Sequence, residues 1–92
     1  MRRFIIERDL PAIGSADREA LKAAAQKSNA TLKELGPSIQ WIESYVAADK
    51  TFCVYLAESE DLIRQHAQKS GFPANKITEI KKTIDPTTAS AR

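Results

Sequence analysis

The chain of 92 residues has one cysteine, Cys53, and one histidine, His66. A single cysteine excludes an internal disulfide and a zinc cage built from several thiolates. A single histidine excludes a multi-histidine metal site within one subunit. The chain also has no His-Glu-x-x-His pattern and no glycine-rich phosphate loop. The sequence motifs of zinc proteases and of nucleotide-binding enzymes are therefore absent.

Long apolar runs and a large excess of either charge are missing too. No apolar stretch approaches the roughly 20 residues that cross a bilayer, and Phe4-Ile5-Ile6 is too short for the apolar core of a signal peptide. The 14 basic and 12 acidic residues give a net charge of +2 and form no basic stripe. We therefore expect a cytoplasmic protein with no membrane partner and no nucleic-acid partner.

Length and composition instead fit one small folded domain. The chain is 42% hydrophobic and 28% charged, which is ordinary for a globular protein. We expect a single domain over residues 1–85. Residues 86–92 are polar and have no packing pattern, so they are expected to form a flexible C-terminal tail.

The strongest pattern lies in residues 40–57, which hold the only Trp and both Tyr residues. Two runs of β-branched and aromatic residues flank Ala48-Asp49-Lys50, which predicts a β-hairpin with a short polar turn. Because strand side chains alternate, the second strand has one apolar face. If the opposite faces of the two strands align, they form a chemically mixed surface that consists of Trp41, Glu43, Tyr45, Cys53 and Tyr55.

Other segments have the periodicity of regular structure. Residues 2–8 place apolar side chains between charges, which predicts a first strand. A helix is expected over residues 15–35, with Ser15 as its N-cap, and a second helix over residues 59–70. Residues 76–84 predict a half-exposed last strand, whose charges suit the edge of a sheet.

The order strand, helix, strand, strand, helix, strand is that of the α+β ferredoxin-like βαββαβ fold. Right-handed crossovers place both helices on one face of a four-stranded antiparallel sheet, with the first and third strands central. We expect Trp41, Tyr45 and Tyr55 on the bare face. Monomers seldom expose such a patch, so a homodimer is expected, in which two sheets pair face to face as a dimeric α+β barrel.

Seven short segments together resemble a known family. They are residues 3–8, 34–37, 41–46, 49–55, 63–67, 71–74 and 84–87. Over nearly its whole length the chain is similar to the small bacterial proteins of a domain family of unknown function, whose described member is a nickel-binding protein. The resemblance implies a ferredoxin-like subunit, a dimer through the sheets and a transition-metal site for Ni²⁺ or another divalent ion.

His66 is the strongest single ligand candidate. It falls on the inward stripe of the second predicted helix, and neutral imidazole is a good ligand for nickel, copper and zinc. Glu7, at the end of the first strand, can share a metal with His66 or accept its hydrogen bond. The alternatives are a hydrogen-bonded core histidine and a surface carboxylate that pairs with Arg3 or Arg8.

Cys53 and Tyr55, with Glu43 and Tyr45 on the neighbouring strand, form a second candidate set. Thiolate and carboxylate together can hold a soft or borderline metal; the alternative is an aromatic dimer core with an inert thiol. By strand alternation, Cys53 and Tyr55 face away from the helical layer that carries His66. The expected site is therefore either His66 with carboxylates and water, or a site assembled across the dimer.

Different classes of function stay open. We expect a small metal-binding protein, nickel-binding by resemblance, rather than an enzyme. The alternative is a small-molecule enzyme of the dimeric α+β barrel kind, isomerase or monooxygenase-like, with His66 and Tyr45 or Tyr55 as acid and base. A regulatory or interaction domain is the third. The fold does not decide between them, because ferredoxin-like subunits host unrelated activities.

Overall fold

Four β-strands and two α-helices make up the body of the protein. The computed structural model describes residues 1–90. Two short 3-10 helices, η1 and η2, complete the secondary structure of this part. In chain order the elements are β1 (Arg2–Asp9), η1 (Ile13–Ser15), α1 (Arg18–Leu35), β2 (Ile39–Val46), β3 (Lys50–Ala57), α2 (Glu60–Ser70), β4 (Lys76–Ile80) and η2 (Pro86–Ser90).

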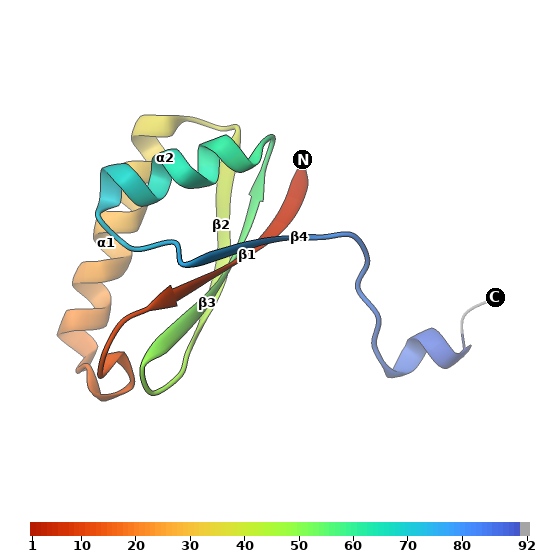
Figure 1. Ribbon diagram of the computed structural model, residues 1–92, viewed down its shortest axis with the longest axis horizontal. Helices are drawn as coiled ribbons and strands as arrows, with labels where there is room; N and C mark the ends of the chain where they lie inside the picture. The colour runs from red at the N-terminus through yellow and green to blue at the C-terminus, as the bar shows by residue number, and fades with distance from the viewer. Residues whose placement is uncertain (91–92) are drawn as a thin grey trace.

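The strands form one antiparallel sheet in the order β2-β3-β1-β4. Figure 1 shows both helices on the same side of this sheet, so that the other side is open. The buried apolar core lies between the helices and the sheet. The predicted α+β ferredoxin-like fold, with the first and third strands central, is confirmed.

Capping side chains fix the helix boundaries. Asp17 caps α1 by accepting a 2.8 Å hydrogen bond from the backbone N–H of Ala20. Ser59 caps α2, and Gly71 ends it in the left-handed conformation that glycine favours. The prediction that Ser15 caps α1 is wrong. Ser15 is the last residue of η1, and the side chain that caps α1 is that of Asp17.

A β-bulge divides β2 into two parts whose side chains alternate differently. Trp41 pairs with Tyr55, but the register then shifts and the next pair joins Glu43 to Val54. Residues directly opposite each other in an antiparallel pair share a face of the sheet. Trp41 therefore lies on one face and Glu43 on the other, and the prediction of one continuous mixed surface is wrong.

The helices cover the face of β3 that was predicted to be bare. Cys53 and Tyr55 are buried on this face, and the ring centroid of Tyr55 lies 5.2 Å from that of His66 on α2. The prediction that these two residues face away from His66 is wrong. Small residues of α1, such as Ser28, leave room for the phenol beneath the helix. The apolar face of β3 points to the open side and carries Phe52, Val54 and Leu56.

The open face of the sheet is apolar along its centre. Tyr45, with 58% of its surface exposed, lies on the same face at the β2 edge, opposite Phe52. Trp41 and Tyr55, which were predicted for this face, lie on the helix side instead. Half-buried side chains from three strands line the centre of the open face: Ile5, Phe52, Val54, Leu56 and Ile80.

The last strand is shorter than predicted. It ends at Ile80, which pairs with Arg3 near the start of β1, whereas the sequence predicted a strand to Ile84. Ile84 is 78% exposed, and Figure 1 shows the following segment running away from the sheet to η2. The domain boundary at residue 85 and the flexibility of the tail stay predictions. Residues 91–92 of that tail lie outside the described residues.

Gly14 allows η1 to dock closely on the turn between β2 and β3. Its backbone N–H donates a 2.9 Å hydrogen bond to the Ala48 carbonyl oxygen. A Cβ atom at position 14 would lie 2.7 Å from the carbonyl oxygen of Ala47. We therefore expect Gly14→Ala to lower the free energy of unfolding by about 1–3 kcal/mol, the usual cost of overpacking.

Urea denaturation measures this effect. Ser15→Ala changes the exposed neighbouring residue and serves as the control; its stability is expected to stay within about 0.5 kcal/mol of the wild type. A Gly14→Ala protein as stable as the wild type would show that the docking of η1 does not depend on the missing side chain.

Candidate functional site

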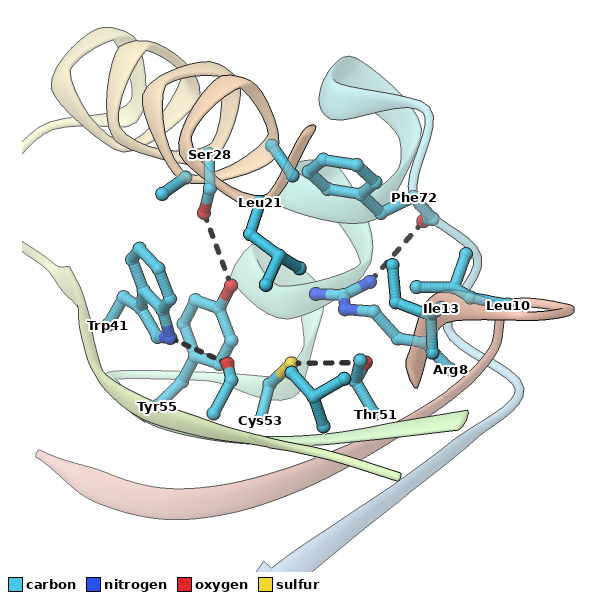
Figure 2. A pocket seen from close by; sticks show the side chains of 14 residues that line it. Arg8, Leu10, Ile13, Leu21, Ser28, Trp41, Thr51, Cys53, Tyr55 and Phe72 are labelled. Carbon is cyan, nitrogen blue, oxygen red and sulfur yellow. Dashed lines mark hydrogen bonds between the residues drawn. The ribbon is translucent and has the colours of Figure 1, made fainter. Parts of the chain in front are cut away.

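A cavity of about 230 Å³ lies between α1, η1 and the β2–β3 hairpin. Figure 2 shows the side chains of the sheet beneath it and those of α1 above it. Most of its lining is apolar, and the largest of its apolar and aromatic side chains are Leu10, Ile13, Leu21, Trp41, Tyr55 and Phe72. The structure therefore offers a partly open, mostly apolar cavity within a single chain.

Arg8, near the end of β1, is buried at the wall of this cavity with 3% of its surface exposed. Its Nη1 donates to the carbonyl oxygens of Phe72 at 3.3 Å and Pro73 at 2.8 Å. Within residues 1–90, its Nη2 has no hydrogen-bond partner and no carboxylate forms an ion pair with it. The aromatic rings of Tyr55 and Phe72 stabilise the positive charge in part, since each ring centroid lies 5.9 Å from the guanidinium carbon.

A buried chain of polar side chains leads from the cavity to α2. The hydroxyl oxygen of Tyr55 lies 3.4 Å from Ser28 Oγ, which lies 3.1 Å from Nε2 of His66. Burial raises the pKa of the Tyr55 phenol, although the Ser28 hydrogen bond and the positive charge of Arg8 act in the other direction. The phenol is therefore neutral at physiological pH and available as a hydrogen-bond donor beside the cavity.

His66 is neutral as well. Burial, and then the positive charge of Arg8, lower its pKa from 6.5 to about 4, while the backbone of Ser28 partly opposes the shift. A neutral imidazole is the form that binds metals, but this one is only 1% exposed. Its Nδ1 has no hydrogen-bond partner within residues 1–90. The geometry is that of a hydrogen-bonded core histidine.

The predicted metal ligands lie on two sides of the sheet. The side covered by the helices holds His66, Cys53 and Tyr55. The open side holds Glu7, Glu43 and Tyr45. In the part of the chain that the structure describes, no group of three or more His, Cys, Asp or Glu side chains could hold a metal ion. The side chains of one subunit therefore do not fit a metal centre, and each ligand assignment stays a prediction.

Glu43 and Tyr45 form a pair on the open side. The hydroxyl group of Tyr45 donates a hydrogen bond to Oε2 of Glu43. This bond, and then the negative charge of Glu43, raise the pKa of Tyr45. Glu7 on the same face has a cation partner, Lys50, at 3.3 Å, whereas Glu43 forms no ion pair within residues 1–90. The carboxylate of Glu43 is thus the one on this face that lacks a positive partner.

Comparison with known proteins shows which family the chain belongs to. A family model described as "Nickel responsive protein SCO4226-like" matches residues 4–80. The chain belongs to the SCO4226-like family. The crystal structure of SCO4226 from Streptomyces coelicolor A3(2) superposes with a TM-score of 0.74 at 16% identity, covering 89% of this chain and 99% of that one. At this identity the likeness shows the fold alone. Comparison with curated protein sequences gives no match.

The predicted resemblance to a small bacterial family is therefore confirmed. The SCO4226-like region spans β1 to β4 and contains every residue that lines the cavity. Within the described residues, no helix is long and apolar enough to span a membrane. The cytoplasmic location stays a prediction.

Sequence reasoning missed Arg8 as a site residue and considered it only as a partner of Glu7. A signal for it was present in the two-residue spacing of Phe4, Ile6 and Arg8, which places all three on the same face of β1. All three are buried in this SCO4226-like fold.

The structure also limits which tyrosine could act with His66 as an acid–base pair in the enzyme alternative. His66 and Tyr45 lie on opposite sides of the sheet, whereas His66 and Tyr55 are joined through Ser28. The enzyme alternative stays a prediction that depends on this buried chain.

Proposed function

We propose that this member of the SCO4226-like family is a small nickel-binding protein that works as a homodimer. The family's description as nickel responsive supports the choice of metal. Among the described residues, one subunit has no cluster of three or more His, Cys, Asp or Glu side chains that could hold a metal ion. We therefore assign the ligands to the open face of the sheet, where two copies would meet. The observation that carries this assignment is the carboxylate of Glu43, which has no positive partner within residues 1–90.

The open face supports the dimer. Apolar side chains from β1, β3 and β4 lie at its centre, next to the charged residues Arg3 and Glu7 of β1. Monomeric proteins rarely leave a contiguous apolar surface in water. Pairing two sheets face to face removes this surface from solvent without any change in the fold. The two-fold symmetry of such a pair also brings each ligand in twice, so that two partial sites become more complete ones.

Glu43 and Tyr45 support the metal position. Carboxylate, phenol and water oxygens can ligate a divalent ion, although nickel binds more strongly when nitrogen ligands are added. The hydrogen bond from Tyr45 holds the Glu43 carboxylate in place. Tyr45 keeps its proton because its pKa is raised, so the carboxylate of Glu43 is the principal ligand in this proposal.

Calorimetric titration with nickel chloride near pH 7.5, on protein without a His tag, tests the assignment. Glu43→Gln keeps the size of the side chain and removes its negative charge. We expect it to raise the Kd for nickel by about tenfold or more, because contacts to a charged group are typically worth about 1.5–3 kcal/mol.

Glu58→Gln is the matched control, since Glu58 is exposed just after β3 and its loss changes the net charge by the same amount. Its nickel affinity is expected to equal that of the wild type. A protein that binds no nickel would refute the proposed function. Loss of affinity in His66→Gln but not in Glu43→Gln would place the metal beneath the helices instead.

A further inference from the structure

We propose that the cavity beneath α1 binds a small apolar carboxylate, with Arg8 as the residue that holds its carboxylate group. This inference concerns the helix side of the sheet and is independent of the proposed nickel site on the open side. It rests on three features of the cavity: a buried cation with an unpaired donor, apolar walls and a small volume.

The unpaired donor of Arg8 is the first feature. A buried charge is costly unless hydrogen bonds and an opposite charge compensate it. Arg8 donates to two carbonyl oxygens, but its Nη2 has no partner within residues 1–90. In Figure 2 the guanidinium group points into the cavity. A carboxylate supplies both the missing acceptor and the missing negative charge, and its geometry matches the planar fork of a guanidinium.

The walls of the cavity select the rest of the ligand. Arg8 is the one charged side chain among the described residues that line the cavity. A cationic ligand would therefore meet a like charge without any acid to balance it. A phosphate or another small polar anion would leave the surfaces of Trp41, Phe72 and Leu21 in contact with water. An acid with an apolar body satisfies both the cation and these walls.

The volume sets the size of that body. A cavity of about 230 Å³ is smaller than the roughly 300–1,000 Å³ of pockets for drug-sized molecules. An apolar cavity of about 150 Å³ in another protein accommodates benzene. The space beneath α1 therefore suits one aromatic ring, or an alkyl chain of similar size, that carries a short acid arm.

Access to Arg8 requires a small movement. Its Nη2 is buried, so an incoming oxygen must displace a side chain that covers it. Leu21, which is 37% exposed, extends from α1 into the cavity in Figure 2. Rotation of this side chain about its own bonds opens the cavity without moving the backbone, since exposed side chains change rotamer within nanoseconds.

Trp41 provides the readout for a binding experiment, because it is the only Trp of the chain and lines the cavity. We would titrate the full, nickel-free chain with phenylacetate and with phenylacetamide, which has nearly the same shape and no charge. We expect phenylacetate to change the Trp41 fluorescence saturably and to bind at least about tenfold more tightly than the amide. Arg8→Met should abolish the preference for the acid.

Ala25→Leu tests the cavity without altering Arg8, because Ala25 lines the cavity from α1 and leucine is a good helix former. It should weaken binding of both probes about tenfold or more. Ala23→Leu, on the exposed side of the same helix, should bind as the wild type does. The proposal is overturned if neither probe binds, if acid and amide bind equally, or if Ala25→Leu binds phenylacetate as tightly as Ala23→Leu does.

Discussion

A homodimer of this protein is expected to dissociate when Leu56 is replaced by Lys. Leu56 lies on β3, a central strand, and points to the open face beside Val54. Its direct neighbours across the sheet are Arg3 on β1 and Gln40 on β2. In a two-fold symmetric dimer the substitution buries two ammonium groups at the same interface, and neither has an acid directly opposite it in its own sheet. We expect the dimer Kd to rise more than about 100-fold, since each buried unpaired charge costs several kcal/mol.

Sedimentation velocity at micromolar concentration measures the dimer, with circular dichroism to confirm that the fold is kept. Ala23→Lys introduces the same charge on the exposed side of α1 and should leave the dimer intact. Trp41→Ala is the informative second variant: the sequence placed Trp41 in the interface, but the structure places it on the cavity side. It should therefore leave dimerisation unchanged. A wild-type protein that sediments as a 10.2 kDa monomer would refute the dimer itself.

The sequence predicted the order of strands and helices because each element carries local signals. Helical spacing and terminal glycines delimit α1 and α2, and alternation around a polar turn marks the β2–β3 hairpin. Local signals also misplaced the start of α1, since Ser15 and Asp17 are both good N-caps and only the docking of η1 on the hairpin turn decides between them.

The faces of the sheet were harder to predict than its strands. Alternation alone assigns Trp41, Glu43 and Tyr45 to one face, but a bulge after Trp41 reverses the assignment for the other two. No glycine or proline near Trp41 marks that bulge in the sequence. The more apolar face of β3 was also expected under the helices, whereas the protein buries Tyr55 there. Ser28 on α1 supplies a hydrogen-bond partner for the Tyr55 hydroxyl group, and His66 on α2 in turn bonds to Ser28.

The candidate site shows the same limit. Sequence reasoning selected residues by their chemistry, so it gathered possible metal ligands that the fold distributes over two sides of the sheet. Arg8 was overlooked because an arginine near the end of a strand is usually solvated. Its importance depends on what surrounds it, namely the carbonyl groups of Phe72 and Pro73 and a cavity, and none of these contacts is local in sequence.

Acid should destabilise the protein through His66 well above the pH range in which most carboxylates titrate. The folded protein holds the pKa of His66 at about 4, against 6.5 for the free side chain. Below pH 6.5 the unfolded chain therefore binds a proton that the folded chain does not. The free energy of unfolding decreases as the pH falls from 6.5 to 4, by about 3 kcal/mol in total, because each pKa unit corresponds to about 1.4 kcal/mol.

His66→Gln tests this linkage, since glutamine can keep a hydrogen bond with Ser28 but does not titrate. Urea denaturation of both proteins at equal concentration between pH 7 and 4 gives the two stability curves. Carboxylates such as Glu79 and Asp85, whose pKa values are lowered, are present in both proteins, so their contributions cancel in the difference. We expect the wild type to lose about 3 kcal/mol more than the variant over this range. Parallel curves, or a resonance of this single imidazole that titrates near pH 6.5 in the folded protein, would show that burial does not keep His66 neutral.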